Sequence, residues 1–307
     1  MEIRNVALLG AGAVGAYFIW GLSEELGDDF CVIAKGDRKK RLKEEGLIIN
    51  GKNYQLNVKE PEEAEKIDLL LVASKQDALY EALDDIKALV SKNTIVISLL
   101  NGVSSEEIIG NTIGAEHMVY SFMRIASVRK GNEIIFTPEI TAGVFIGEKD
   151  YMEPTERTDA IINLFKNTKI RCTYVKDIIT DMWFKYAGNV SQNLPQAIIG
   201  VGFHAYIDST HLYQIAEKLW KEVAAVANAK GVPLTSECQL FYGAKPDSRF
   251  STLQDIDAKR HTEIEMLAGE MIRMGKECNI SVPYCEYTYH LIKAIEEKND
   301  GKFLYKS

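Results

Sequence analysis

Residue types that build metal and redox sites are scarce in this sequence of 307 residues. The five cysteines are an odd number and lie scattered without a Cys-x-x-Cys pair, and the five histidines form no His-x-x-x-His pattern. We therefore expect no metal site, and we interpret the cysteines as reduced, mostly buried small hydrophobic residues.

Long hydrophobic runs are also absent. No stretch approaches the length of a membrane span, and glycines break the first apolar run where a signal peptide would continue. We therefore expect a cytoplasmic protein without a membrane partner. The net charge of −8 argues against a general nucleic-acid surface. One basic island at residues 35–41 is the exception, and its ordinary interpretation is a solvated helix face.

A glycine-rich turn directly follows the first apolar segment. Residues 5–9 have the composition of a buried strand, and an apolar helix follows. The spacing fits dinucleotide binding: Gly10 allows a tight turn, Gly12 lets the backbone approach a pyrophosphate, and Gly15 lets the helix pack on the strand. The N–H groups at the helix N-terminus would bind the phosphates. The expected cofactor contacts in this turn are Gly10, Ala11, Gly12, Ala13, Val14 and Gly15.

Strand-like and helix-like segments alternate through the first half, and long helices fill the second. This predicts an α/β protein: a Rossmann-type doubly wound domain over 1–175, then an all-helical domain over 176–307. The expected strands are 5–9, 30–34, 69–73, 94–99, 121–128, 134–137, 140–146 and 171–174, with a hairpin of 47–49 and 54–58 around Asn50-Gly51. The expected helices are 14–26, one containing 41–45, 78–90, 156–167, 178–200, 209–230, 235–242, 250–278 and 284–298.

The end of the second strand selects the nicotinamide cofactor. In Rossmann units an acidic residue about 20 residues past the last glycine binds the ribose 2′-hydroxyl, whereas cations accept a 2′-phosphate. Here that position is Lys35, and Arg38 lies one turn further on. These charges favour NADP (NADPH) over NAD, although Asp37 lies nearby.

Two further loops follow strands at the edge where open α/β sheets bind ligands. Lys75 follows one strand and would face a phosphate or a substrate carboxylate. Asn101 follows the next strand and would bind the nicotinamide ribose or the substrate. The ordinary alternatives are a surface lysine and a common Asn-Gly turn.

A polar stripe interrupts an otherwise apolar helix in the second half. Lys185, Asn189 and Asn193 recur at every fourth residue and would line one face. The stripe holds no carboxylate, so it needs a partner, unless it is simply a helix edge wetted by solvent. Further on, Ser251 stands where an N-cap would, and Glu263 could supply the missing carboxylate. His261 is interpreted as structural and held by nearby acids.

With these motifs in the same order over essentially the whole chain, the sequence resembles the 2-dehydropantoate 2-reductase (ketopantoate reductase) family. The matching segments are residues 9–15, 74–76, 100–102, 183–189 with Asn193, 251–256 and 260–264. The segments from residue 183 onward are far more specific to this family than the glycine turn. The sequence departs from many family members at Leu194-Pro195, where proline often follows the asparagine directly, and at Lys35, where arginine is common.

The resemblance implies NADPH-dependent reduction of 2-ketopantoate to pantoate, a step of pantothenate and coenzyme A biosynthesis. It implies that Lys185 is the general acid and Glu263 its partner carboxylate. It also implies that Asn189, Asn193 and Ser251 anchor the substrate, that Asn101 lies near the nicotinamide, and that Lys75 belongs to the cofactor site.

The chemistry of these residue types agrees with those roles. Hydride arriving at a ketone carbon leaves charge on oxygen, which an ammonium both stabilises and protonates. A free lysine, with a pKa of about 10.4, is a slow acid at neutral pH. Desolvation would favour its neutral form and a neighbouring carboxylate its charged form, and the sequence does not decide between them.

Three alternatives stay open from sequence alone. The protein could reduce a different 2-oxo acid, or it could be a non-catalytic NADPH-binding sensor, although both the lysine and the carboxylate are present. A 3-hydroxyacid or glycerol-phosphate type of dehydrogenase shares the general layout, but the 251–263 stretch argues against it. Long amphipathic helices would serve a homodimer surface or close the second domain equally well.

Overall fold

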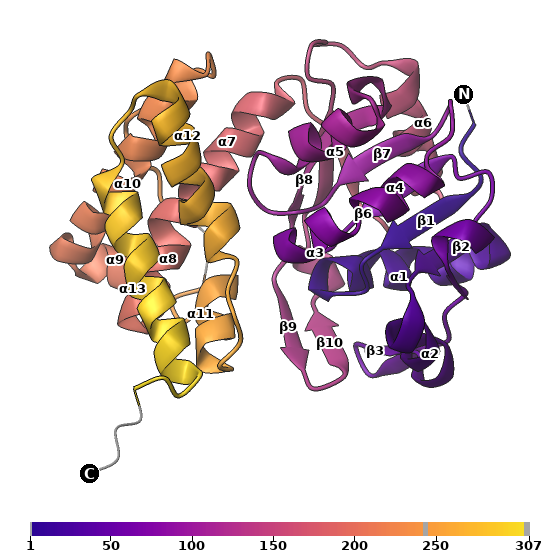
Figure 1. The fold of residues 1–307 in the computed structure, drawn as a ribbon, viewed down its shortest axis with the longest axis horizontal. Helices are drawn as coiled ribbons and strands as arrows, with labels where there is room; N and C mark the ends of the chain where they lie inside the picture. Colours follow the sequence, from indigo (N-terminus) through magenta and orange to yellow (C-terminus); the bar gives the residue numbers. More distant parts are fainter. Residues whose placement is uncertain (1, 242–244, 304–307) are drawn as a thin grey trace. The chain divides into compact units, whose positions relative to one another are not determined.

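The computed structural model describes residues 2–241 and 245–303. The chain divides into two compact units, Met1–Ile179 and Thr180–Ser307, which are described separately. Figure 1 shows that the first unit contains the strands, while the second is built from helices.

Within the described residues, the first unit holds an eight-stranded sheet with the order β12-β11-β8-β7-β6-β1-β2-β5. The parallel strands are β1 (Val6–Leu9), β2 (Phe30–Ile33), β5 (Val58–Lys59), β6 (Leu69–Val72), β7 (Ile95–Ser98) and β8 (Met118–Arg124). At one edge β11 (Gly143–Gly147) runs antiparallel to β8, and β12 (Cys172–Tyr174) runs parallel to β11. The arrangement confirms the predicted Rossmann-type fold, in which strand order reverses next to β1.

Every residue of β1, β2, β6 and β7 is buried, as expected for parallel strands covered on both faces. The helices of this unit are α1 (Ala13–Leu26), α2 (Gly36–Glu45), α3 (Gln76–Glu81), α4 (Leu83–Leu89), α5 (Ser105–Ile113) and α6 (Glu156–Lys166). Figure 1 shows α3, α4 and α5 over one face of the sheet. The sequence pattern does not predict α5, and the expected single helix over 78–90 is two helices.

A smaller sheet of the order β4-β3-β10-β9 accompanies the large one among the described residues. Its strands are β3 (Leu47–Ile49), β4 (Lys52–Tyr54), β9 (Ser127–Lys130) and β10 (Glu133–Phe136). The predicted hairpin exists, with positive φ at Asn50 and Gly51, but its second strand ends where residues 54–58 were expected to begin. The single strand expected over 121–128 is wrong, because β8 and β9 belong to different sheets.

All regular elements in the described part of the second unit are helices, with no strand among them, as predicted. Its elements are α7 (Ile178–Gly188), a π-helix over Asn189–Asn193, α8 (Leu194–Ile199), α9 (Ala205–Asp208), α10 (Thr210–Ala229), α11 (Ser251–Asp257), a second π-helix over Glu265–Gly269, α12 (Glu270–Cys278) and α13 (Pro283–Asn299). No helix in the described residues has the length and apolar character needed to cross a membrane. The helix predicted over 178–200 is continuous over 178–199 with the π-helix inside it, whereas the helix predicted over 250–278 is broken at residues 258–263.

The helix predicted over 235–242 is wrong for 235–241, and residue 242 lies outside the described residues. Two buried glutamines hold the non-helical backbone that precedes α11, and Gln192 is the one that bonds to residues 239 and 241. The Gln192 side chain donates to the Gln239 carbonyl and accepts from the Phe241 N–H, both at 3.0 Å. The Gln196 side chain bonds in the same way to the Ser248 carbonyl (3.0 Å) and the Phe250 N–H (2.7 Å). Within 235–241 the Gln192 amide therefore pairs two backbone groups that a helix would have paired internally, and Gln196 does the same for two groups just before α11.

The N-cap predicted at Ser251 is also wrong. Phe250, in an extended conformation, occupies the N-cap position of α11, and Ser251 is the first helical residue. The Ser251 side chain is exposed and caps no backbone group. It is therefore not required for starting this helix and is free to serve another purpose.

Candidate functional site

The turn after β1 has the close approaches that the glycine spacing predicts. A Cβ at Gly10, where φ is +109°, would lie 2.5 Å from the Ala73 carbonyl carbon and oxygen. A Cβ at Gly15 would lie 1.9 Å from the Gly10 carbonyl oxygen. Both positions exclude any side chain, because β6 and α1 pack directly on the turn.

Gly12 differs from these two glycines because a Cβ there would meet nothing within 4 Å. It is the N-cap of the 14-residue helix α1, and no side chain caps that end of the helix. The N-terminus of α1 therefore has no capping side chain, and the space beside Gly12 is open. This is the arrangement that a pyrophosphate requires, so the chain fits a dinucleotide here.

The loops carrying Lys75 and Asn101 leave the sheet at the same edge as the glycine turn. Leu9 pairs with Val72, and Val72 pairs with Ser98, so the carboxyl ends of β1, β6 and β7 are level. Lys75 is exposed at the start of α3, whereas Asn101 is half-buried in front of Gly102. The structure thus brings the predicted residues of the first unit to one edge of its sheet.

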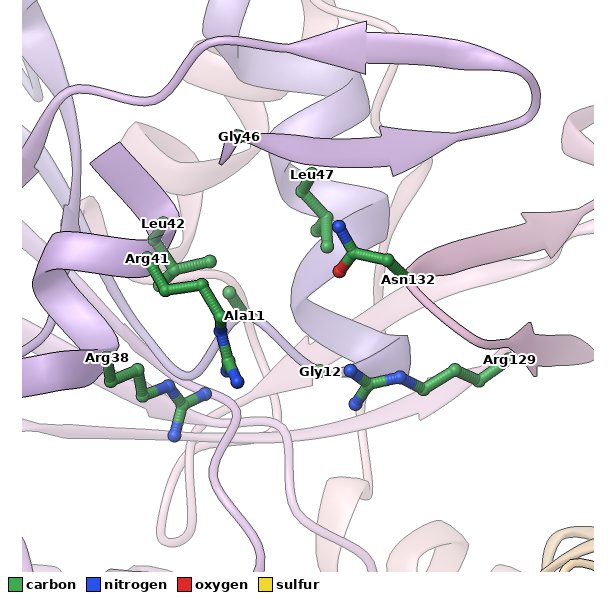
Figure 2. A pocket seen from close by; sticks show the side chains of 9 residues that line it. All are labelled: Ala11, Gly12, Arg38, Arg41, Leu42, Gly46, Leu47, Arg129 and Asn132. Atoms are coloured by element: carbon green, nitrogen blue, oxygen red, sulfur yellow. The ribbon is translucent and has the colours of Figure 1, made fainter. Parts of the chain in front are cut away.

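A pocket of about 220 Å³ opens beside the glycine turn. Figure 2 shows three arginine side chains around it, Arg38 and Arg41 from α2 and Arg129 from β9. The remaining lining residues are Ala11, Gly12, Leu42, Gly46, Leu47 and Asn132. Although Arg38 keeps contact with solvent, partial burial of its guanidinium and the positive charges of Arg41 and Arg129 lower its pKa. The pocket is thus strongly positive and suited to an anion.

Lys35, the other predicted phosphate ligand, does not line this pocket. Its ammonium donates to the Asp85 carboxylate and lies 3.7 Å from Glu62. The bond to Asp85 raises the pKa of Lys35, so the amine is fully charged but already paired. Lys39 is paired in the same way, with Glu60 (3.3 Å) and Glu63 (2.8 Å). In the basic island, Lys35 and Lys39 are therefore paired with carboxylates, whereas Arg38 and Arg41 line the pocket.

In the second unit, the predicted polar stripe crosses from α7 into a π-helix. Lys185 is half-buried near the end of α7, and Asn189 and Asn193 begin and end the π-helix. The two amides lie on one face, since Nδ2 of Asn193 is 3.5 Å from Oδ1 of Asn189. A π-turn within an α-helix is costly and commonly marks a functional site.

Two polar atoms in this π-helix are buried without a hydrogen-bond partner among the described residues. They are Oδ1 of Asn193 and Oγ of Ser191. Asn193 is only 6% exposed, so its unpaired acceptor carries a desolvation cost of about 1–3 kcal/mol. Such a cost is expected where a ligand supplies the missing donor.

A second π-helix faces the first. The Tyr186 hydroxyl donates to the Leu267 carbonyl at 2.5 Å, which links α7 to the π-helix over Glu265–Gly269. Burial raises the pKa of the Tyr186 phenol well above its usual value, so the phenol stays protonated and donates. The sequence pattern gave no sign of either π-helix.

The segment that carries Glu263 is held by a buried carboxylate on α13. Glu296 accepts hydrogen bonds from the N–H and the hydroxyl of Thr262, each at 2.7 Å, and lies 3.3 Å from the Lys293 ammonium. The His261 ring lies 3.1 Å from Asp300 and 3.7 Å from Glu296, so acids adjoin this histidine as expected. Glu296 thus fixes the two residues immediately before Glu263.

We expect Glu296→Ala to lower the free energy of unfolding by about 2 kcal/mol, because it leaves Thr262 and Lys293 without their buried partner. Glu297→Ala on the same helix is the matched control. Glu297 pairs with Lys302 at the surface, so its loss should change the free energy by less than about 0.5 kcal/mol. Urea denaturation of both variants measures the difference, and equal effects would contradict the role given to Glu296.

The fold and the two sites together define a class of protein. A doubly wound unit with a nucleotide-type glycine turn precedes a helical unit in which a half-buried lysine shares a helix face with two buried amides, which is the organisation of a two-part dinucleotide-dependent oxidoreductase.

The chain belongs to the ketopantoate reductase family. Residues 6–150 match the family described as ketopantoate reductase PanE/ApbA, and residues 177–296 match the C-terminal part of the same family. The protein is accordingly an oxidoreductase of the ketopantoate reductase type.

Curated relatives extend over nearly the whole chain. The 2-dehydropantoate 2-reductase of Streptococcus pyogenes serotype M3 is 25% identical over 303 residues, covering 95% of this chain and 97% of that protein. The enzyme of the same name from Pyrococcus horikoshii is 26% identical over 314 residues, covering 97% and 99%.

Solved structures share the fold. A PanE/ApbA family ketopantoate reductase from Ralstonia eutropha JMP134 has a TM-score of 0.80 at 22% identity. A D-mandelate dehydrogenase solved with NADH and anilino(oxo)acetate has a TM-score of 0.80 at 23% identity. A dimeric ketopantoate reductase from Staphylococcus aureus has a TM-score of 0.78 at 19% identity. Each comparison covers 96% of this chain and 99% of the other.

Proposed function

We propose that the protein reduces 2-dehydropantoate to pantoate with NADPH, a step of pantothenate and coenzyme A biosynthesis. The names of the curated relatives support this substrate. The observation that carries the proposal is the face of half-buried Lys185 with buried Asn189 and Asn193, where the Asn193 amide oxygen lacks a donor that a hydroxyl-bearing substrate would supply.

The first unit is proposed to bind the cofactor. Gly10, Gly12 and Gly15 would place the pyrophosphate over the N-terminus of α1, and Lys75 would lie near a phosphate. Asn101 would bind the nicotinamide ribose. When bound, the reduced nicotinamide supplies a hydride.

The second unit is proposed to supply the acid. As hydride reaches the ketone carbon, negative charge develops on the substrate oxygen, and the Lys185 ammonium stabilises that charge and then donates its proton. Glu263 would hold the ammonium in its charged form. Asn189, Asn193 and Ser251 would anchor the substrate through its polar groups.

The preference for NADPH rests on charge. The residues that line the arginine pocket include no carboxylate, and a 2′-phosphate dianion would be attracted to three guanidinium groups. A ribose 2′-hydroxyl would gain much less there, since an acidic acceptor is missing.

A second candidate is a reductase of a different 2-oxo acid. The similarity in fold to D-mandelate dehydrogenase favours keeping it, because that protein was solved with a 2-oxo acid analogue and NADH. In this alternative, Lys185 and Glu263 keep their roles and only the substrate pocket and cofactor preference change.

Steady-state kinetics on a 2-oxo acid panel tests the proposal. The panel contains 2-dehydropantoate, 2-oxo acids without its gem-dimethyl and hydroxymethyl groups, and benzoylformate, each with NADPH and with NADH. We expect kcat/KM to be highest for 2-dehydropantoate with NADPH, by about tenfold or more over the others. A higher value for benzoylformate with NADH would favour the second candidate, and no oxidation with any substrate would contradict both.

A further inference from the structure

The arginine pocket includes a residue from a distant part of the chain. Arg38 and Arg41 belong to α2, whereas Arg129 lies on β9 of the smaller sheet. Figure 2 shows the Arg129 side chain directed across the pocket from the hairpin that also carries Asn132.

Specific pairing places Arg129 there. Arg129 pairs with Ile134 across the β9–β10 hairpin, and β10 runs parallel to β3, which directly follows α2. Oδ1 of Asn50 accepts the Phe136 N–H at 2.9 Å, and the Glu133 carboxylate accepts the Gly51 N–H at 2.9 Å. The hairpin is therefore fixed to the segment that follows α2.

The charges in the pocket lack compensation. Within residues 2–241 and 245–303, Arg38 and Arg41 have no carboxylate partner, and Arg129 donates from Nε to the Gly131 carbonyl at 3.1 Å. The neighbouring lysines Lys35 and Lys39 both face carboxylates. Three like charges around one pocket repel one another unless an anion joins them.

We propose that Arg129 is a cofactor-specificity residue which, with Arg38 and Arg41, binds the 2′-phosphate of NADPH in this pocket. The inference rests on the proposed function, since it assigns the phosphate subsite of the same cofactor. It assigns that subsite not to the paired Lys35 but to two arginines of helix α2 and one of strand β9 in the smaller sheet. A guanidinium binds a phosphate through two parallel hydrogen bonds, so each arginine adds geometric selectivity as well as charge.

Isothermal titration calorimetry with adenosine 2′,5′-bisphosphate and with AMP isolates the 2′-phosphate without requiring turnover. We expect Arg129→Gln to weaken the bisphosphate about tenfold, or about 1.4 kcal/mol, and to change AMP binding by less than about twofold. Arg129→Glu should weaken the bisphosphate further, because it adds a repelling charge. Lys130→Gln, which removes an exposed charge from the same hairpin outside the pocket, should leave both affinities within about twofold.

Equal weakening of AMP and bisphosphate by Arg129→Gln would overturn the proposal, as would an effect of Lys130→Gln as large as that of Arg129→Gln. Wild-type protein that prefers the bisphosphate while Arg129→Gln behaves like wild type would overturn the inference alone. Wild-type protein that binds neither the bisphosphate nor NADPH would contradict the proposed function itself.

Discussion

Lys185→Ala is expected to lower kcat for reduction of the 2-oxo acid by about three orders of magnitude. The variant loses both the charge that stabilises the developing oxyanion and the proton that neutralises it, and either loss alone typically costs about a hundredfold or more. Because the side chain belongs to the second unit, NADPH binding to the glycine turn of the first should remain. Stopped-flow and steady-state measurements of NADPH oxidation provide kcat, and fluorescence titration provides the cofactor affinity.

Lys218→Ala is the matched control for this variant. Lys218 is an exposed lysine on α10 of the same unit, so its removal should leave kcat within about twofold. If Lys185→Ala retained turnover within a few-fold of wild type, or if Lys218→Ala lost as much, the role of Lys185 as general acid would be wrong.

Two glycines of one turn are expected to respond oppositely to alanine. Gly15→Ala forces a methyl group to within 1.9 Å of the Gly10 carbonyl oxygen and should destabilise the first unit by about 3 kcal/mol. Gly12→Ala places its methyl group in open space at an extended φ of −92°, so the fold should keep its stability. The same methyl group stands where a pyrophosphate would approach, and we expect NADPH affinity to fall by at least about tenfold.

Thermal denaturation and calorimetric titration of the two variants separate these effects. The expected outcome is a lower melting temperature for Gly15→Ala and an unchanged one, with weakened NADPH binding, for Gly12→Ala. Full NADPH affinity in a stable Gly12→Ala protein would show that the cofactor does not use this turn.

Local signals explain what the sequence predicted well. Gly10, Gly12 and Gly15 lie within six residues, and the close approach of Gly15 is to Gly10 itself, so their spacing conveys the geometry of the turn. The Asn50-Gly51 turn is similarly local, because both residues adopt the positive φ that a two-residue hairpin demands. The alternation of apolar strands with helices is also visible in short stretches of sequence, and it identified the doubly wound sheet.

Non-local contacts explain what the sequence did not predict. Arg129 meets α2 only because β10 pairs with β3, a pairing that no local pattern encodes. The irregular 235–241 segment depends on a hydrogen bond from Gln192, which is more than 40 residues earlier in the chain. Gln196, one turn after Gln192, makes a similar bond to Ser248. Helix propensity gives no sign that these two glutamines are buried and bonded to a distant loop. The π-helix at Asn189 was also not predicted, because the same helix-forming residues occur in α-helical and π-helical turns.

Transfer of deuterium from NADPH labelled at the reactive nicotinamide carbon tests the central claim most directly. With 2-dehydropantoate as substrate, the account predicts a 2-hydroxy acid carrying deuterium on the former carbonyl carbon, detected by mass spectrometry and NMR. In deuterated water with unlabelled NADPH, the same carbon should carry no deuterium, since only the hydroxyl proton comes from Lys185 and solvent. Label that appears from solvent and not from NADPH, or NADPH that binds without forming product, would contradict the account.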